Sequence, residues 1–178
     1  MRARGVVFAL ALWACHAVLS IGVEPDWTAR RAAVMDFELL NEMQDYETDE
    51  SRAALERRLA LITEALRQEF DQRGLYRTLD NNAAAKLIAE QRVLQNLRNC
   101  NGCEVDIGRA LGADVVILGW VQKVSNLILN LNIEVKDVAS GHTLYTKSVD
   151  LRSNSDKSWL RGIRYMVDSI EEKKQYLR

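Results

Sequence analysis

The chain has 178 residues, of which 24 are basic and 25 acidic, so its formal net charge at pH 7 is −1. The two charge signs are interleaved without a basic block, which excludes the electrostatic footprint typical of a nucleic-acid-binding protein. The length fits one domain that can bury a substantial core.

The amino terminus has the layout of a secretory signal peptide. Met1-Arg2-Ala3-Arg4 is short and basic, and a largely apolar run from Val6 to Val23 follows. A basic start, an apolar middle and small residues near the end are typical of a cleaved signal. We therefore expect a signal peptide over residues 1–22, one domain over residues 23–178, and a location in the periplasm or outside the cell. Its removal leaves 22 basic residues against 25 acidic ones, a net charge of −3.

Two alternatives concern the same segment. A retained membrane anchor would need about 20 apolar residues, and the polar pair Cys15-His16 interrupts a shorter run. Leu12-Trp13-Ala14-Cys15 resembles a bacterial lipoprotein box, in which the cysteine carries a lipid, although Trp13 is bulky for such a box. Lipidation at Cys15 would give peripheral membrane association, and we expect it less than simple cleavage.

Strands and helices are expected to alternate in the first half of the domain. Residues 31–40 show the partial alternation of a strand, and a polar loop follows over 41–50. Residues 51–73 carry apolar side chains at steps of three and four, which indicates a helix that Gly74 ends. A short strand is expected over 75–79. A second helix over 83–97 would bury a stripe made of Ala84, Leu87, Ile88, Gln91, Leu94 and Leu97.

The second half predicts a helix, a three-stranded meander and a last helix. After a helix over 104–111, residues 115–124 form an apolar strand. In the next strand, over 127–135, one face is expected to carry Leu127, Leu129, Leu131, Ile133 and Val135, and the other the polar residues Asn130, Asn132, Glu134 and Lys136. Such alternation indicates an antiparallel strand with one covered face. Turns at 125–126 and 139–142 connect these strands to a third over 143–151. The last helix begins near Ser155 or Asp156 and is expected to bury Trp159, Ile163, Met166, Val167 and Ile170.

This order of elements predicts an α/β (α+β) fold. Its sheet is mixed, parallel at the start and antiparallel in the carboxy-terminal meander, and helices pack against it.

The meander resembles a family of uncharacterised bacterial secreted proteins, catalogued as a domain of unknown function. The resemblance rests on residues 111–114 (LGAD), residues 119–127 (GWVQKVSNL) and residues 154–162, and it covers most of the mature chain. The pattern of Gly-Ala-Asp, an apolar strand and a glycine-containing turn is more distantly similar to the amino-terminal domain of TolB and to the periplasmic domain of CsgG. The resemblance implies a similar fold and an envelope location, where those domains bind other proteins. It implies no reaction, because a fold alone does not fix a function.

Cys100 and Cys103 are the sharpest chemical feature of the sequence. Outside the cytoplasm two nearby thiols usually oxidise, so we expect a disulfide that fixes the turn before the helix over 104–111. A redox-active pair is the alternative, because a cysteine near a helix amino terminus can have a lowered thiol pKa. A zinc site needs about four ligands, and the mature chain adds one histidine, His142. We expect neither a metal nor another cofactor.

The sequence carries no catalytic motif that would indicate an enzyme. His142 lies in an expected turn without a nucleophile nearby. Neither a Gly-x-Ser-x-Gly elbow nor a phosphate-binding glycine loop occurs in the sequence.

Residue types that anchor protein interfaces gather at the first hairpin and on the last helix. The candidate binding residues are Trp120, Gln122, Lys123, Ser125, Asn126, Trp159 and Arg161. The alternative for Trp120 and Trp159 is a place in the core, since large aromatic side chains bury the most area. We expect a non-catalytic accessory module that binds an unidentified envelope protein. A thiol–disulfide redox protein that uses Cys100 and Cys103, and a carrier of a small ligand, are the alternatives.

Overall fold

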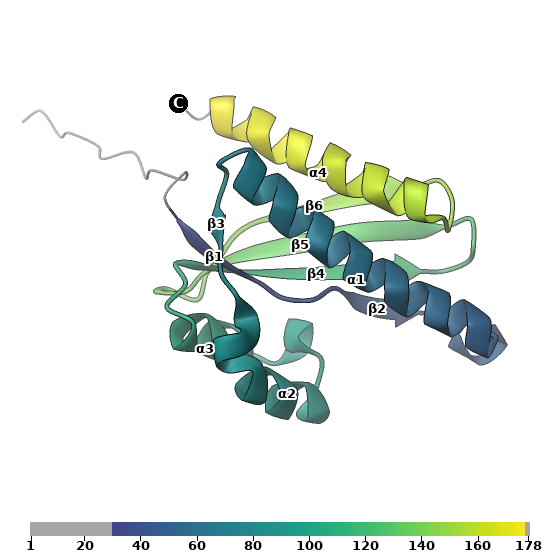
Figure 1. Ribbon diagram of the computed structural model, residues 1–178, viewed down its shortest axis with the longest axis horizontal. Coiled ribbons are helices and arrows are strands. Elements are labelled where there is room, and N and C mark those ends of the chain that lie inside the picture. The colour runs from purple at the N-terminus through teal and green to yellow at the C-terminus, as the bar shows by residue number, and fades with distance from the viewer. Residues whose placement is uncertain (1–29, 177–178) are drawn as a thin grey trace, which may run out of the picture.

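A mixed sheet of six strands forms the centre of the computed structural model, which describes residues 30–176 (Figure 1). The strands lie in the order β3 (Arg77–Thr78), β1 (Arg31–Val34), β4 (Val115–Lys123), β5 (Leu129–Asp137) and β6 (Thr143–Leu151). A short strand, β2 (Glu38–Asn41), continues beyond β1 along the same side of β4. The pairs of β1, β2 and β3 are parallel, and β4, β5 and β6 pair antiparallel. The predicted mixed sheet with its carboxy-terminal meander is confirmed.

Helices cover the two faces of this sheet unequally (Figure 1). The long helices α1 (Asp49–Gln72) and α4 (Asp156–Tyr176) lie side by side on one face. The shorter helices α2 (Ala85–Leu94) and α3 (Cys103–Ala110), with 3-10 turns at Asn81–Ala84 and Leu97–Asn99, lie on the other. The core on this second side takes its sheet residues from β1 and the first half of β4, so β5 and β6 stay uncovered there.

The larger core lies between the sheet and the two long helices. Odd-numbered residues of β4 and β5, such as Ile117, Leu131 and Ile133, point toward α1 and α4. Each fully buried side chain of this kind contributes about 1.5–3 kcal/mol relative to an exposed one. The expected stripe of the last helix is confirmed, since its members are buried or partly buried in this core: Trp159, Ile163, Met166, Val167 and Ile170.

The strand expected over 31–40 is interrupted at residues 35–37. Phe37 turns into the larger core, and its ring fills the space that the missing Cβ of Gly119 leaves, where a Cβ atom would lie only 2.5 Å from the ring. Thr63 of α1 gives the Phe37 backbone a hydrogen-bond partner in this gap between the strands, because its Oγ1 accepts a hydrogen bond of 3.0 Å from Phe37 N. The interruption therefore follows from contacts with α1 and β4 that are distant in sequence.

The helix expected over 83–97 is shorter than the apolar pattern indicates. It opens as a 3-10 turn and ends at Leu94, because Gln95 is extended. The 3-10 turn that follows, Leu97–Asn99, buries Leu97. Leu94, which was expected in the same stripe, is exposed. A second difference lies in the first hairpin, where β5 begins at Leu129 and not at residue 127.

The expected signal peptide lies outside the described residues, and so does Cys15, the residue of the alternative lipidation site. Within residues 30–176 every helix is too short or too polar to cross a bilayer.

Candidate functional site

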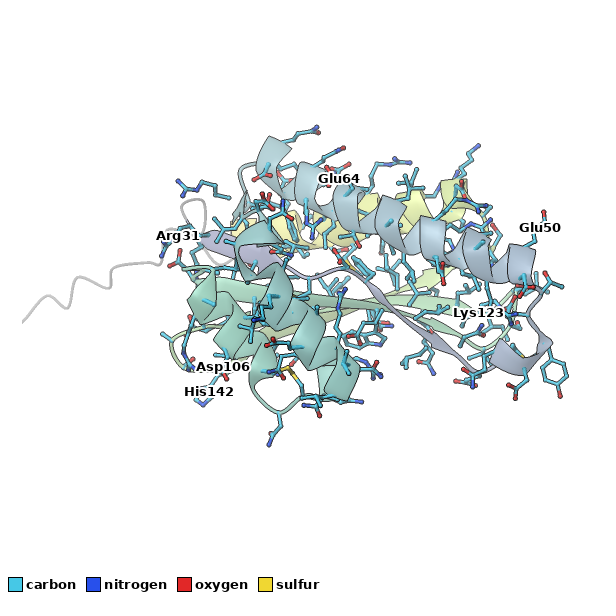
Figure 2. The ribbon with its side chains drawn as sticks, turned by 60° about the horizontal axis from the view of Figure 1, so that its bottom comes forward. Arg31, Glu50, Glu64, Asp106, Lys123 and His142 are labelled. Carbon is cyan, nitrogen blue, oxygen red and sulfur yellow. A yellow bond between two sulfur atoms is a disulfide. The ribbon has the colours of Figure 1, made fainter. Side chains whose placement is uncertain are left out.

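Three connecting segments meet at one end of the sheet, and we call them together the loop end: residues 42–48, 124–128 and 152–155. Figure 2 shows Lys123 of β4 near this end, beside the start of α1, whereas Asp106 and His142 lie at the opposite end of the sheet. A hydrogen bond of 3.1 Å from Asn154 Nδ2 to Asn126 Oδ1 connects two of the segments.

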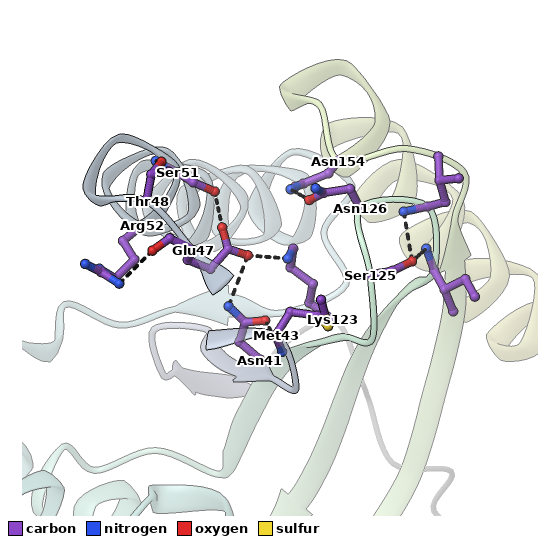
Figure 3. A network of polar contacts seen from close by, with 12 residues as sticks. Asn41, Met43, Glu47, Thr48, Ser51, Arg52, Lys123, Ser125, Asn126 and Asn154 are labelled. Carbon is purple, nitrogen blue, oxygen red and sulfur yellow. Dashed lines mark hydrogen bonds and ion pairs between the residues drawn. The ribbon is translucent and has the colours of Figure 1, made fainter. Parts of the chain in front are cut away.

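A buried ion pair holds the first of these segments in place. Lys123, the last residue of β4, contacts the Glu47 carboxylate, and the two side chains are only 2% and 6% exposed (Figure 3). The hydrogen bond from Lys123 holds the pKa of the Glu47 carboxyl below its usual value, and the hydroxyl of Ser51 adds to this effect. Asn41 Nδ2 donates a further hydrogen bond of 3.3 Å to Glu47. The pair fixes residues 42–48 over the carboxyl end of β4.

The start of α1 is ordered by the same segment. Thr48 Oγ1 accepts a hydrogen bond of 3.1 Å from Ser51 N and so caps the helix. Arg52 Nη1 donates to the Glu47 carbonyl oxygen at 2.9 Å. The loop and the first turn of the helix therefore form one hydrogen-bonded unit.

The hairpin between β4 and β5 is closed by Ser125. Its hydroxyl accepts hydrogen bonds from the backbone N–H groups of Leu127 and Ile128, at 3.2 and 3.1 Å. This turn presents both apolar side chains to solvent, with Leu127 78% and Ile128 58% exposed. Tyr46, in the neighbouring segment, is 81% exposed. The loop end thus combines a rigid polar base with three large exposed apolar side chains.

The uncovered face of β4, β5 and β6 is polar. Asn132 Oδ1 accepts from Ser148 Oγ at 2.7 Å, and Asn130 donates to Asp150, so cross-strand pairs satisfy much of this surface. Trp120 lies on the same face, with the Arg98 guanidinium 5.6 Å from its ring centroid. Gln122 Nε2 donates to Glu42 at 2.9 Å. These residues form a solvated face beside the loop end.

The candidate binding residues do not form one surface. Lys123 is buried by its ion pair, and Trp159 is buried in the larger core, so neither side chain is available to a partner. Arg161 is exposed on α4, which covers the face of the sheet opposite to the one that carries Trp120. Ser125 and Asn126 remain at the loop end, where their side chains hold the hairpin and its contact with Asn154.

Sequence reasoning missed the exposed apolar residues of the loop end. The alternation of residues 127–135 predicts Leu127 on the buried face, and Tyr46 lies in a segment whose composition predicts a plain polar and acidic loop. A usable signal was the pair Leu127-Ile128, because two adjacent apolar residues cannot both face the core of a strand with one covered side.

Cys100 and Cys103 form a disulfide at the start of α3, which lies on the face of the sheet opposite to α1 and α4. Both cysteines and Glu104 are buried, and Glu104 Oε2 lies 3.0 Å from Cys100 Sγ. Glu104 also accepts a hydrogen bond of 3.1 Å from Gly102 N and forms an ion pair of 2.6 Å with Lys136 Nζ. Among the described residues, these two cysteines and Glu104 are the one group of three potential metal ligands close together, but the disulfide occupies both sulfurs.

The chain is similar in fold to solved structures of bacterial proteins. The NMR structure of LpoB from Escherichia coli is 13% identical, with a TM-score of 0.52 over 86% of this chain and 84% of LpoB. Lipoprotein GNA1162 from Neisseria meningitidis is 15% identical, with a TM-score of 0.44 over 83% of this chain and 96% of that protein. TolB from Acinetobacter baumannii is 10% identical, with a TM-score of 0.39 over 78% of this chain and 28% of TolB.

At these identities the similarity to LpoB concerns the fold alone. Comparison with curated proteins gives no match. The resemblance to CsgG stays a prediction. The expected membership of an uncharacterised family is confirmed, since residues 30–170 match the family described as "Protein of unknown function (DUF2380)", and the chain belongs to this family.

Proposed function

We propose that this protein is a non-catalytic accessory module of the bacterial cell envelope that binds another protein through its loop end. The observation that carries the proposal is the exposure of Tyr46, Leu127 and Ile128 on segments that a buried ion pair and a hydroxyl-capped turn hold in place. Contiguous exposed apolar surface rimmed by polar residues marks interaction sites, and Leu127 and Ile128 are adjacent in one turn. A surface that is ordered beforehand loses little conformational entropy on binding.

The surroundings of the disulfide support a structural role over a redox role. Thiol–disulfide exchange needs an accessible sulfur and a stabilised thiolate. Both sulfur-bearing residues are buried, and the Glu104 carboxylate 3.0 Å from Cys100 Sγ would oppose a negative charge on that sulfur. The envelope location rests on the expected signal peptide and on the resemblance of the meander to envelope domains.

Photocrosslinking in living cells tests the binding surface. Tyr46 is replaced by p-benzoylphenylalanine, and Tyr165, an exposed tyrosine of α4, is replaced in the same way as the matched control. We expect one dominant envelope protein to be captured from position 46 and not from position 165. The paired substitution Leu127→Ser and Ile128→Ser should abolish the capture without lowering the thermal stability.

Two results would count against the proposal. One is the same set of proteins captured from both positions, which indicates random encounters. The other is a capture from position 46 that survives the paired substitution, which means that the apolar hairpin does not contribute to binding.

A further inference from the structure

A pocket of about 750 Å³ lies between α1 and α2, at the carboxyl ends of β1 and β3. After β1 the chain continues into β2 of the same sheet, and after β3 it enters α2, which lies on the face opposite to α1 (Figure 1). The volume falls within the range of small-molecule sites, about 300–1,000 Å³.

The floor of the pocket is built by side chains from both walls. The carbonyl oxygen of Val34, the last residue of β1, accepts hydrogen bonds from Arg67 Nη2 of α1 and from Asn81 Nδ2, each at 2.8 Å. Within residues 30–176, the remaining buried polar atoms of these two side chains, Arg67 Nε and Asn81 Oδ1, have no hydrogen-bond partner. Buried polar atoms without a partner are rare.

Two arginines meet at the mouth of the pocket. Arg67 Nη2 and Arg92 Nη1 lie 3.1 and 3.2 Å from the carboxylate of Asp36, which the interruption between β1 and β2 presents there. The Asp36 side chain is 55% exposed, so solvent reaches it. Arg67 and Arg92 are the two cationic side chains of the lining, which also carries the Glu64 carboxylate. Arginine forks of this kind recognise carboxylates.

The far wall of the pocket has the opposite character. Asp71 accepts a hydrogen bond of 2.8 Å from Thr78 N, and Asp80 accepts one of 2.9 Å from Asn82 N. Both carboxylates line the pocket and are exposed. A ligand that reaches this wall is favoured when its second end is cationic or donates hydrogen bonds.

We propose that this pocket binds a small zwitterionic carboxylate, such as an amino acid or a short peptide. Arg67 and Arg92 hold the ligand carboxylate in place of the Asp36 side chain, and the acidic wall receives the cationic end. Asp36 is then an internal competitor of the ligand. This site is separate from the loop end, and it stands or falls independently of the protein-binding surface.

Nuclear magnetic resonance of the arginine side chains tests the proposal with two probes. Glycylglycine carries the carboxylate, and glycylglycinamide differs from it mainly in lacking that group. At constant ionic strength, glycylglycine should shift the Nε–Hε resonances of Arg67 and Arg92 to saturation, and glycylglycinamide should not. Asp36→Asn should tighten binding on the order of tenfold, because it removes a competing charge. Arg92→Gln should weaken it by about tenfold or more.

The matched control is Arg109→Gln, which removes an exposed arginine paired with Asp106 on α3. Its affinity for glycylglycine should equal that of the unaltered protein, and the melting temperatures of all variants should confirm that each is folded. Equal shifts with both probes, an unchanged affinity in Asp36→Asn, or an equal loss in Arg109→Gln would overturn the proposal. Absence of any saturable shift would overturn it as well.

Discussion

Replacing Lys123 by methionine is the most direct test of how the loop end is held together. The substitution keeps the length and the apolar stem of the side chain but leaves the Glu47 carboxylate without its ion-pair partner. Removing one partner of a buried ion pair costs about 3–5 kcal/mol, because the other charge remains buried and uncompensated. Since the two side chains are only 2% and 6% exposed, we expect this full penalty here.

Two further variants separate the charge effect from packing. Lys123→Met combined with Glu47→Leu removes both charges, and its stability should return to within about 1–2 kcal/mol of the unaltered protein or exceed it. Arg109→Ala breaks the pair with Asp106 on α3, whose side chains are 57% and 67% exposed. Exposed pairs of this kind contribute about 0.2–1 kcal/mol. Urea unfolding followed by circular dichroism measures all three differences.

The pH dependence supplies an independent check on the same pair. The pKa of Glu47 in the folded protein lies below its usual value of 4.5, mainly because Lys123 donates to its carboxylate. The stabilisation is therefore complete above pH 4.5 and is lost as the pH falls through the folded pKa. A loss of less than 1 kcal/mol in Lys123→Met at pH 7, or a loss that stays the same at pH 2, would refute the reasoning.

Three further predictions concern other parts of the fold. Gly119→Ala should destabilise the protein by about 1–3 kcal/mol in urea unfolding, because the added Cβ would lie 2.5 Å from the Phe37 ring; an additional Phe37→Leu should recover part of this loss. Glu104→Gln should speed the reduction of the disulfide by dithiothreitol, followed by mass spectrometry, because the leaving Cys100 thiolate no longer faces a carboxylate; an unchanged rate would contradict this. Burial raises the pKa of Tyr76 above 10.0, so the unfolded chain ionises first and stability should fall as the pH rises from 10.0 through the folded pKa. Tyr76→Phe should reduce that fall, and an identical alkaline profile in this variant would argue against the prediction.

The periodic elements of this fold could be predicted from the sequence because local patterns determine them. The alternation of β5 and the apolar stripe of α4 each indicate one covered face, and both elements form, although β5 begins two residues later than expected. The stripe expected up to Leu94 failed for a physical reason. The helix ends at that residue because Gln95 is extended, and the Leu94 side chain is left in solvent.

The candidate site depended on contacts that no local pattern records. Lys123 occupies an odd position of β4, in step with the buried Val121, so its burial is consistent with the strand period. Its partner Glu47 lies 76 positions earlier, in a segment that shows no periodicity. The local sequence around either residue therefore does not predict the ion pair. The same holds for Asp36, which is presented at a pocket only because Phe37 packs over Gly119 in a distant strand.

The parallel pairing of β1 with β4 has a consequence for the order in which the chain folds. Arg31 and Asp114, which bind each other where the two strands begin, are 83 positions apart, whereas β4 and β5 meet across residues 124–128. Closing the long loop costs more entropy than closing the hairpin. The ribosome synthesises β1 before β4, so β1 cannot form its pairing with β4 until β4 has been made. We therefore expect the meander to form early and to set the folding rate, while β1 joins late, so that substitutions in β1 mainly accelerate unfolding.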